Sequence, residues 1–505
     1  MTHRRWIGAF LCLAAIAVAV SVPFLSFTID DAFITFRQAA RLAHGSLSYN
    51  ASSMIEASSS LIHVILIALI LRIPHATPEV AAHALGVLGI LATAAALTWH
   101  VREHAGSDRG MLPAAMALPA VVLTGTSLST WWFLGLETPL WVAALVVGAA
   151  GIDAWAWRDR DGGRRAALAV AILLPLLRPE GGLIAVAWLA ALALMRPSSW
   201  PRLRWLLLAA ALTSVVAGVG RLLLFGLWFP APVYLKAPTA QRWRIIGGMH
   251  YLLHAFTFDP HDPGAWLFAA CVLIAAGWWL IPMTRRRVAG RLMAAAPFLI
   301  PCALLMAMAV LVGGDWMPAS RLVVPTFPLL GMAVVAAGHA RRSRILPLVV
   351  VTAATALGVM THAGELRRGL FAVSRTADPC RNQLGDDLAR FGKASEVLAV
   401  ADIGLLGYRF PGDVLDYFGV ANPTLARAGR GNGAASAEDV LKDRPAWLLV
   451  YASGQVVAPI WPIDVDGYIR PVTESLARSE MLWREYKVFD QCQALPGHWA
   501  VLMRR

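Results

Sequence analysis

The feature that most constrains the fold of this 505-residue chain is a series of long apolar runs separated by clusters of arginine. The chain is 58% hydrophobic and 15% charged, a composition typical of a polytopic membrane protein and unlike that of a soluble enzyme. A helix needs about 20 consecutive apolar residues to cross a bilayer, and the first run, residues 6–28, is long enough. The sequence therefore predicts an α-helical polytopic membrane protein.

Six clusters of basic residues separate these runs and hold 18 of the 27 Lys and Arg residues that precede residue 364. Cytoplasmic loops of membrane proteins are enriched in Lys and Arg. Placing all six clusters in the cytoplasm predicts about 11 transmembrane helices, with the N-terminus cytoplasmic and the C-terminal region extracytoplasmic. The clusters are Arg4 and Arg5; Arg102 and Arg109; Arg158, Arg160, Arg164 and Arg165; Arg196, Arg202 and Arg204; Arg285, Arg286, Arg287 and Arg291; Arg341, Arg342 and Arg344.

The net charge of +13 arises entirely in residues 1–363, because residues 364–505 hold 17 basic and 17 acidic side chains. No basic stripe with interleaved aromatic residues stands outside the apolar runs, so we expect the lipid bilayer and not nucleic acid as a partner.

Two apolar stretches are too short to cross the bilayer. Residues 60–73 amount to about 14 residues, and reading them as a span would invert every later loop. We therefore predict a re-entrant or interfacial helix inside a first extracytoplasmic loop, residues 29–79. Pro175 and the sequence RPEGG at 178–182 likewise split one long run into two halves, whose polar groups must be buried in protein or face a wet cavity.

After residue 364 the pattern changes to that of a soluble domain. VLAVAD ends a buried-strand pattern at Asp402, and further strands are indicated by DVLDYFG and PAWLLVYAS. We predict a transmembrane domain, 1–363, followed by an extracytoplasmic α/β domain, 364–505. Cys380 and Cys492 bracket that second domain, and the sequence leaves open whether they form a disulfide.

Two adjacent acids, Asp30 and Asp31, stand where the first apolar run ends. Carboxylates at a membrane rim are costly to place, which marks them as candidates for a functional site. A partly desolvated carboxylate can act as a general base. The alternative is that the pair caps a helix beginning at Ala32, a role compatible with catalysis.

Other polar stretches fall on the same predicted face. Four cations there are candidates for binding a phosphate: Arg37, Arg178, Lys236 and Arg321. Lys236 is equally explained by snorkelling to the interface, and Arg178 by an internal salt bridge with Glu180. Candidate substrate contacts are Glu137, Glu180, Tyr234, Asp315 and Trp316; Glu137 could instead cap a helix, and Trp316 could belong to an interfacial aromatic belt.

One pair of histidines has a spacing that suits zinc. His250 and His254 are four residues apart, but no HExxH motif and no third ligand accompany them, so an ordinary interfacial pair is the simpler interpretation.

As a set, these motifs resemble the GT-C superfamily of integral-membrane glycosyltransferases, and within it bacterial enzymes related to the mycobacterial terminal arabinofuranosyltransferase. The matching text is DDAFITFRQAARLAHG with Tyr49 and Asn50 soon after, GLETPLW, LRPEGG, PVYLK, GGDWMPASRLVVPTFPLL and ADIGLLGYRFPGDVLDYFGVANPTLAR. The resemblance implies a polyprenyl-phosphate sugar donor and transfer on the extracytoplasmic face of a bacterial inner or plasma membrane. It also implies that Asp30 is the base and that Asp31, its neighbour, holds the acceptor or a divalent cation.

The sequence thus predicts an inverting glycosyltransferase that moves a sugar, with arabinofuranose the nearest analogy, to a cell-envelope glycan, glycolipid or protein. Inversion follows from one base and no visible nucleophile. The alternatives are a non-catalytic transporter or flippase of lipid-linked sugars and an assembly factor that has lost activity. A transporter favours polar residues near mid-membrane on broken helices, whereas these acids cluster at the ends of spans.

Overall fold

Two compact units make up the chain, and each is assembled from three separate stretches of sequence. The first unit comprises Met1–Leu25, His83–Val215 and Ala240–Ala372, and the second comprises Ser26–Ala82, Val216–Thr239 and Val373–Arg505. The computed structural model describes residues 3–105, 128–235, 241–257, 285–315, 317, 319–337, 379–427, 435–459, 470–494 and 497–505. The predicted boundary at 363/364 lies outside the described residues, and the predicted first loop, 29–79, belongs to the second unit with the C-terminal region.

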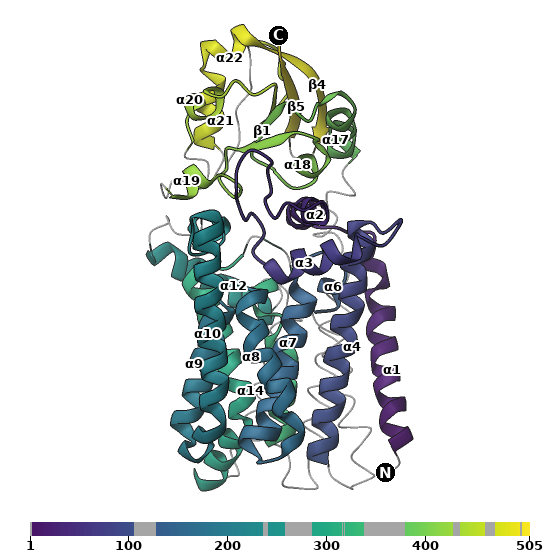
Figure 1. Cartoon of the computed structure of the whole chain (residues 1–505), viewed down its shortest axis with the longest axis vertical. Coiled ribbons are helices and arrows are strands. Elements are labelled where there is room, and N and C mark those ends of the chain that lie inside the picture. Colours follow the sequence, from purple (N-terminus) through teal and green to yellow (C-terminus); the bar gives the residue numbers. More distant parts are fainter. Residues whose placement is uncertain are drawn as a thin grey trace. The chain divides into compact units, whose positions relative to one another are not determined.

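The first unit is built from helices. Figure 1 shows α7, α8, α9 and α14 running side by side, and contacts join each of these neighbours. Glycines allow close approach: a Cβ on Gly148 of α7 would lie 2.6 Å from a Val170 methyl of α8. The helices with residues in this unit are α1 (His3–Ser21), α4 (Pro78–Ala105), α6 (Leu128–Trp131), α7 (Thr138–Ile152) with the π-helical turn η2 (Asp153–Trp157), α8 (Arg164–Leu177), α9 (Gly181–Met195), α10 (Trp200–Phe225), α12 (Gln241–Thr257), α14 (Arg285–Val312) and α15 (Thr326–Ala337), with 3₁₀ turns η3 (Asp161–Gly163), η4 (Pro197–Ser199) and η5 (Arg321–Val323).

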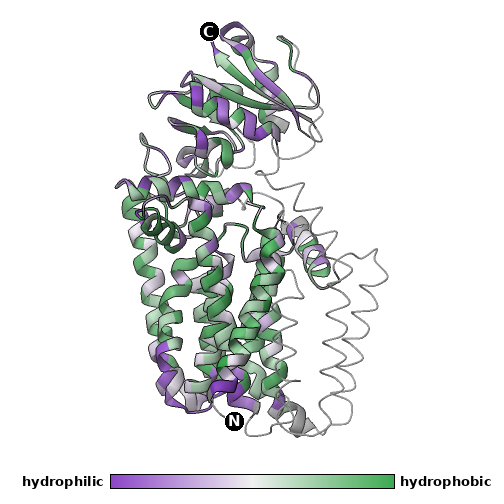
Figure 2. Ribbon diagram, turned by 90° about the vertical axis from the view of Figure 1, so that its right-hand side faces the viewer, coloured by the Kyte–Doolittle hydropathy of each residue, from purple (hydrophilic) through white to green (hydrophobic). Residues whose placement is uncertain are grey.

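Five helices in the described part of the chain are long and apolar enough to cross a membrane, so the protein is an integral membrane protein with multiple spans. They are Arg4–Phe24, Pro78–His104, Thr138–Trp157, Pro197–Phe225 and Ala289–Val312. Figure 2 shows apolar residues along their lengths and hydrophilic residues toward their ends. The predicted count of about 11 is not confirmed, because the remaining apolar runs fall within 106–127, 258–284 and 338–378, outside the described residues, or form shorter helices.

Both stretches that were predicted to be too short form short helices. Residues 60–73 contain α3 (Leu61–Ile70), a helix of 10 residues that begins where the Ser60 hydroxyl accepts a hydrogen bond from the His63 N–H. At 1.5 Å per residue this helix is about 15 Å long, half the thickness of a hydrocarbon core. The RPEGG sequence separates α8 from α9, which have 14 and 15 residues. The predicted shortness is confirmed, and the re-entrant or interfacial placement of α3 stays a prediction.

The C-terminal part of the second unit is a five-stranded mixed sheet with strand order β2-β1-β3-β5-β4. β1 (Val397–Val400), β2 (Asp413–Asp416) and β3 (Trp447–Ala452) are parallel, and Val397 lies opposite Asp413. β5 (Gly497–Arg504) runs antiparallel to β3 and to β4 (Tyr486–Ala494). The three predicted strands are confirmed, and the α/β domain gains a hairpin, β4–β5, that the sequence analysis did not identify.

Helices cover both faces of this sheet. Leu398 and Val400 of β1 pack on one side with α17 (Pro379–Phe391) and α18 (Leu405–Arg409), whereas Ala399 packs on the other. Burial on both faces explains why β1 reads as an uninterrupted apolar run. The opposite face carries α20 (Ala437–Leu441), α21 (Arg470–Ala477) and α22 (Glu480–Glu485); α19 (Pro423–Arg427) follows β2 along the chain (Figure 1). Cys380 of α17 and Cys492 of β4 form a disulfide, with 5.5 Å between their Cα atoms.

The loop after α2 (Asp30–Ala43) completes the core of the second unit. Tyr49 and Ile55 are fully buried against the same sheet face as Leu398. The Asn50 amide donates to the Val414 carbonyl at 2.8 Å and accepts from the Val414 N–H at 3.0 Å, which pairs the outer side of β2 as a neighbouring strand would. The first loop and the C-terminal region therefore fold as one unit, together with α3 and α11 (Ala231–Leu235).

Candidate functional site

Asp30 is the first residue of α2, and its carboxylate is bound to the C-terminal region. The side chain is 4% exposed, and Oδ1 accepts a hydrogen bond from the Leu405 N–H at 3.1 Å. A Cβ placed on Gly404 would lie 2.0 Å from Asp30 Oδ2, so only glycine allows this approach. Asp31, the next residue, is half-buried and more accessible than Asp30.

The sequence offered helix capping as an alternative role for the two acids, but the N-cap position of α2 is one residue before Asp30. Ile29 holds the N-cap position of α2, and its side chain makes no capping hydrogen bond. Asp30 and Asp31 both stand in the first turn, where the helix dipole favours negative charge.

Arg37, predicted to bind phosphate, is committed to backbone carbonyls. Its guanidinium donates to the carbonyls of Tyr49 at 3.1 Å, Phe410 at 2.8 Å and Gly412 at 2.5 Å, and also to that of Gly407. The side chain is 5% exposed. Four of its five N–H donors are thus used within the second unit. These hydrogen bonds join Arg37 of α2 to α18 and to the segment that follows α18.

A further buried ion pair in the second unit was not identified from the sequence. Glu56 accepts two hydrogen bonds from Arg221, at 2.7 and 3.3 Å, and both residues are buried. Burial raises the pKa of the Glu56 carboxyl, and the neighbouring Arg221 guanidinium opposes that shift. The signal in the sequence was Arg221 itself, a charge within an apolar run.

In the first unit, Arg178 lies between two carboxylates. Its Nε is 2.6 Å from Glu180 Oε1 and its Nη1 is 2.7 Å from Glu137 Oε1. Arg178 is 7% exposed and Glu137 is 2% exposed. The predicted Arg178–Glu180 salt bridge is confirmed. Glu137 holds the N-cap position of α7 but its side chain makes no cap bond, and it pairs with Arg178 instead.

A second buried pair lies on the segment after α14. Arg321 Nη2 and Nε lie 2.7 and 2.9 Å from Asp315 Oδ2, and the guanidinium stands 6.0 Å from the Trp131 ring. The Trp131 indole N–H donates to the Ala319 carbonyl at 3.0 Å, where Ala319 and Ser320 have left-handed backbone conformations, with φ of 57° and 50°. Asp315 and Arg321, which lie six positions apart in the sequence, are therefore paired.

The remaining predicted site residues are Lys236, Trp316 and Tyr234. Lys236 and Trp316 lie outside the described residues. Tyr234 of α11 is partly buried against the sheet core, and its hydroxyl accepts from the Phe229 N–H at 3.3 Å. Asp30, Asp31 and Arg37 thus belong to the second unit, and the Arg178 and Arg321 pairs to the first.

The fold is similar to that of a solved membrane protein. The crystal structure of ArnT from Cupriavidus metallidurans bound to undecaprenyl phosphate matches with a TM-score of 0.53 and 15% sequence identity, over 89% of this chain and 93% of the ArnT chain. Residues 374–501 match the family described as Domain of unknown function (DUF8728). No curated protein matches this sequence.

At 15% identity this similarity establishes the fold: an ArnT-like arrangement of membrane helices with a C-terminal mixed-sheet domain. The helical membrane fold with a C-terminal α/β domain, which was expected from the sequence, agrees with this similarity. The nearer likeness to arabinofuranosyltransferases receives no support from the comparisons and stays a prediction.

Proposed function

We propose that this protein is a glycosyltransferase that takes a sugar from a polyprenyl-phosphate donor and transfers it to a cell-envelope glycan, glycolipid or protein outside the cytoplasm. The observation that carries the proposal is the similarity of the fold to that of ArnT, which extends over 89% of the chain. The ArnT crystal structure has undecaprenyl phosphate bound. The acid doublet at the start of α2 supplies the chemistry that such a fold needs.

The proposed reaction is a single displacement. The acceptor oxygen bonds to the anomeric carbon while the bond from that carbon to the phosphate oxygen breaks, and the polyprenyl phosphate leaves with the bonding electron pair. The acceptor proton passes to the carboxylate of Asp30, and one displacement inverts the anomeric configuration. Leu405 fixes one oxygen of Asp30, and the more accessible Asp31 would hold the acceptor hydroxyl or a divalent cation.

For the leaving phosphate we propose Arg178 and Arg321, with Lys236 as a third cation. Arg178 and Arg321 are buried, and each already binds carboxylate oxygens, the geometry that also suits phosphate oxygens. We leave Arg37 out of this set, because its donors are used by backbone carbonyls. The substrate contacts proposed for Tyr234 and Trp316 remain predictions.

The disulfide supports an extracytoplasmic C-terminal region, since such bonds persist in oxidising compartments. Cysteine introduced at position 31, the more accessible of the two acids, tests that orientation in a full-length chain that lacks Cys12, Cys271 and Cys302 but keeps the disulfide. Labelling by an impermeant maleimide from the extracytoplasmic side is expected. Access from the cytoplasm alone would overturn the scheme.

The activity test has two stages. Mass analysis of envelope glycans from a deletion strain identifies the missing sugar and its acceptor. Purified full-length protein is then assayed with that donor and acceptor, comparing Asp30→Asn and Asp31→Asn with Asp386→Asn, an exposed control in α17.

We expect Asp30→Asn to lower transfer by about 10²- to 10⁴-fold while undecaprenyl phosphate still binds. The control should match the wild type. Undiminished transfer by Asp30→Asn would reject the base assignment, and a wild-type protein that binds the lipid without transferring sugar would favour a transporter. A product of retained configuration would reject the single displacement.

A further inference from the structure

Three buried side chains of the first unit form a cluster that the proposed sugar transfer does not use. His100 and His104 lie one turn apart on α4, and Asp153 is the first residue of η2, directly after α7. Their exposures are 2%, 7% and 1%. One nitrogen of each histidine and one carboxylate oxygen all lie within 4.8 Å of one another.

Backbone carbonyls fix which nitrogen of each imidazole carries the proton. His100 Nε2 lies 3.0 Å from the Met332 carbonyl, and His104 Nδ1 lies 3.0 Å from the His100 carbonyl. A carbonyl only accepts hydrogen bonds, so both of these nitrogens are donors. In a neutral ring the remaining nitrogen, His100 Nδ1 or His104 Nε2, has a lone pair.

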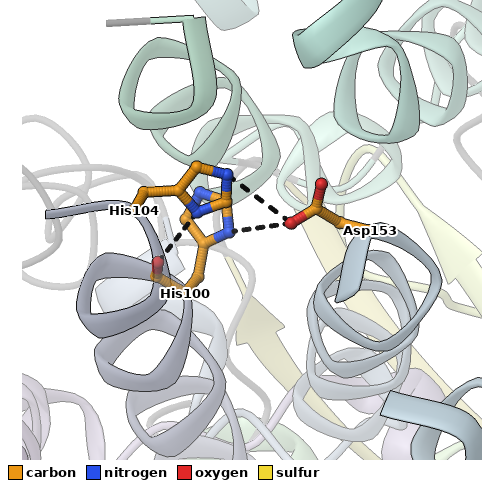
Figure 3. A group of neighbouring side chains, drawn as sticks. All are labelled: His100, His104 and Asp153. Carbon is orange, nitrogen blue, oxygen red and sulfur yellow. Dashed lines mark hydrogen bonds and ion pairs between the residues drawn. The ribbon is translucent and has the colours of Figure 1, made fainter. Parts of the chain in front are cut away.

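Both of these lone pairs are directed toward one carboxylate. His104 Nε2 lies 3.6 Å and His100 Nδ1 lies 4.0 Å from Asp153 Oδ2 (Figure 3). These distances are too long for ordinary hydrogen bonds. His100 Nδ1 is fully buried and has no hydrogen-bond partner among the residues that the structure describes. Three electron-pair donors therefore face one another, an arrangement that a bound cation would stabilise.

The spacing of the donor atoms suits a small divalent cation. Nitrogen and oxygen ligands lie about 2.0–2.2 Å from zinc, so two ligands of one tetrahedral ion are roughly 3.4 Å apart. The two nitrogen–oxygen distances of 3.6 and 4.0 Å exceed this by a few tenths of an ångström, and all three donor atoms lie within 4.8 Å of one another, so binding would draw them together. The hydrogen bonds from each histidine to a backbone carbonyl are of the kind that orients metal-binding imidazoles.

The charged neighbours are compatible with such an ion. Arg158 Nη2 contacts Asp153 Oδ2 at 2.8 Å, and Asp153 Oδ1 has no hydrogen-bond partner in the described part of the chain. With Oδ2 bound to the metal, Arg158 would remain an outer contact of the kind that ligating carboxylates receive. The nearby Arg160 charge is paired with Glu103.

We propose that His100, His104 and Asp153 bind a zinc ion, with water in the fourth position. The ion would connect α4 to the end of α7, and the His100 bond to Met332 would extend that connection to α15. Its role is to stabilise the first unit, and it does not depend on the proposed sugar transfer.

Zinc content of the purified full-length protein tests the site. The chain is incubated with ZnCl₂, freed of excess metal and analysed by mass spectrometry for bound zinc, and CoCl₂ loading is followed by visible absorption. We expect about one zinc per chain, a tetrahedral cobalt spectrum, and a higher unfolding temperature with zinc than after chelation.

His104→Ala and Asp153→Asn should each lower zinc retention at least about tenfold. The matched control is the double variant His250→Gln, His254→Gln, because this exposed pair on α12 has the same spacing along a helix and should leave the zinc content unchanged. Wild-type protein that retains no zinc, with no change in unfolding temperature, would overturn the proposal. The three side chains would then share a proton in place of a metal ion. Loss of zinc in the control with retention in Asp153→Asn would also overturn it. If His104→Ala does not fold, Asp153→Asn and the wild-type measurement still decide.

Discussion

Asp30 accepts a hydrogen bond from the backbone N–H of Leu405, a residue 375 positions later in the chain. The first acid after the first membrane span is therefore positioned by a turn of the C-terminal region. If Asp30 is the base, the small sheet domain orients the catalytic carboxylate.

Gly404→Ala tests this relationship. A Cβ at position 404 would lie 2.0 Å from Asp30 Oδ2, so the carboxylate must move. We expect transfer to fall about 10- to 100-fold, because small misplacements of a reacting group carry penalties of that size. The assay is the transfer rate of the full-length protein. Gly162→Ala is the control, since a Cβ there meets no atom within 4 Å, and equal rates for both variants would refute the positioning role.

Arg37→Lys separates a structural role from phosphate binding. Lysine keeps the charge but loses the planar set of donors that contacts four carbonyls. We expect a loss of about 2–4 kcal/mol in unfolding free energy, because buried carbonyls are left without donors. Thermal unfolding of the purified protein measures the change, with the exposed Arg390→Lys as control. Unchanged stability with weaker undecaprenyl phosphate binding would instead return Arg37 to the phosphate set.

Arg178→Lys should weaken binding of undecaprenyl phosphate. Arginine can contact two phosphate oxygens at once, whereas lysine contacts them as a point charge. We expect at least about a tenfold loss of affinity, which corresponds to roughly 1.4 kcal/mol. A lipid-binding titration provides the measurement. Arg202→Lys, in a more exposed pair with Asp159, should bind as the wild type does; equal affinities in all three proteins would argue against a phosphate contact at Arg178.

Asp413 makes the second unit sensitive to acid. Burial acts to raise the pKa of this carboxyl, but hydrogen bonds from Ser52 and Ala51 outweigh it, and the net pKa lies below the usual value. A depressed pKa in the folded state stabilises the fold above the unfolded-state pKa of about 4, and this contribution is lost as the pH falls through the folded-state pKa.

Asp413→Asn should therefore lower the unfolding temperature at pH 7 and flatten its decline between about pH 5 and pH 3. Unfolding temperatures measured across that range check the prediction. An acid profile identical to that of the wild type would show that the contacts of Asp413 with Ala51 and Ser52 do not contribute.

The local pattern of the sequence was sufficient to predict several elements of the fold. The apolar runs indicated membrane helices, the 60–73 run indicated a short helix, and uninterrupted apolar segments indicated β1 and β3. Each of these follows from the hydrophobicity of neighbouring residues. The β4 strand was missed because YKVFDQCQA mixes polar and apolar residues without a clear run.

The tertiary structure alone decided which groups meet. The sequence marked Asp30 and Arg37 as notable, yet the Leu405 N–H on Asp30 and three of the four carbonyls on Arg37 belong to the backbone of residues 405–412, which no side-chain pattern identifies. His100 and His104 show the spacing of a metal pair, but Asp153 joins them only because α4 packs near the end of α7. Local periodicity is encoded by adjacent residues, whereas these sites depend on chain segments that folding brings together from distant positions.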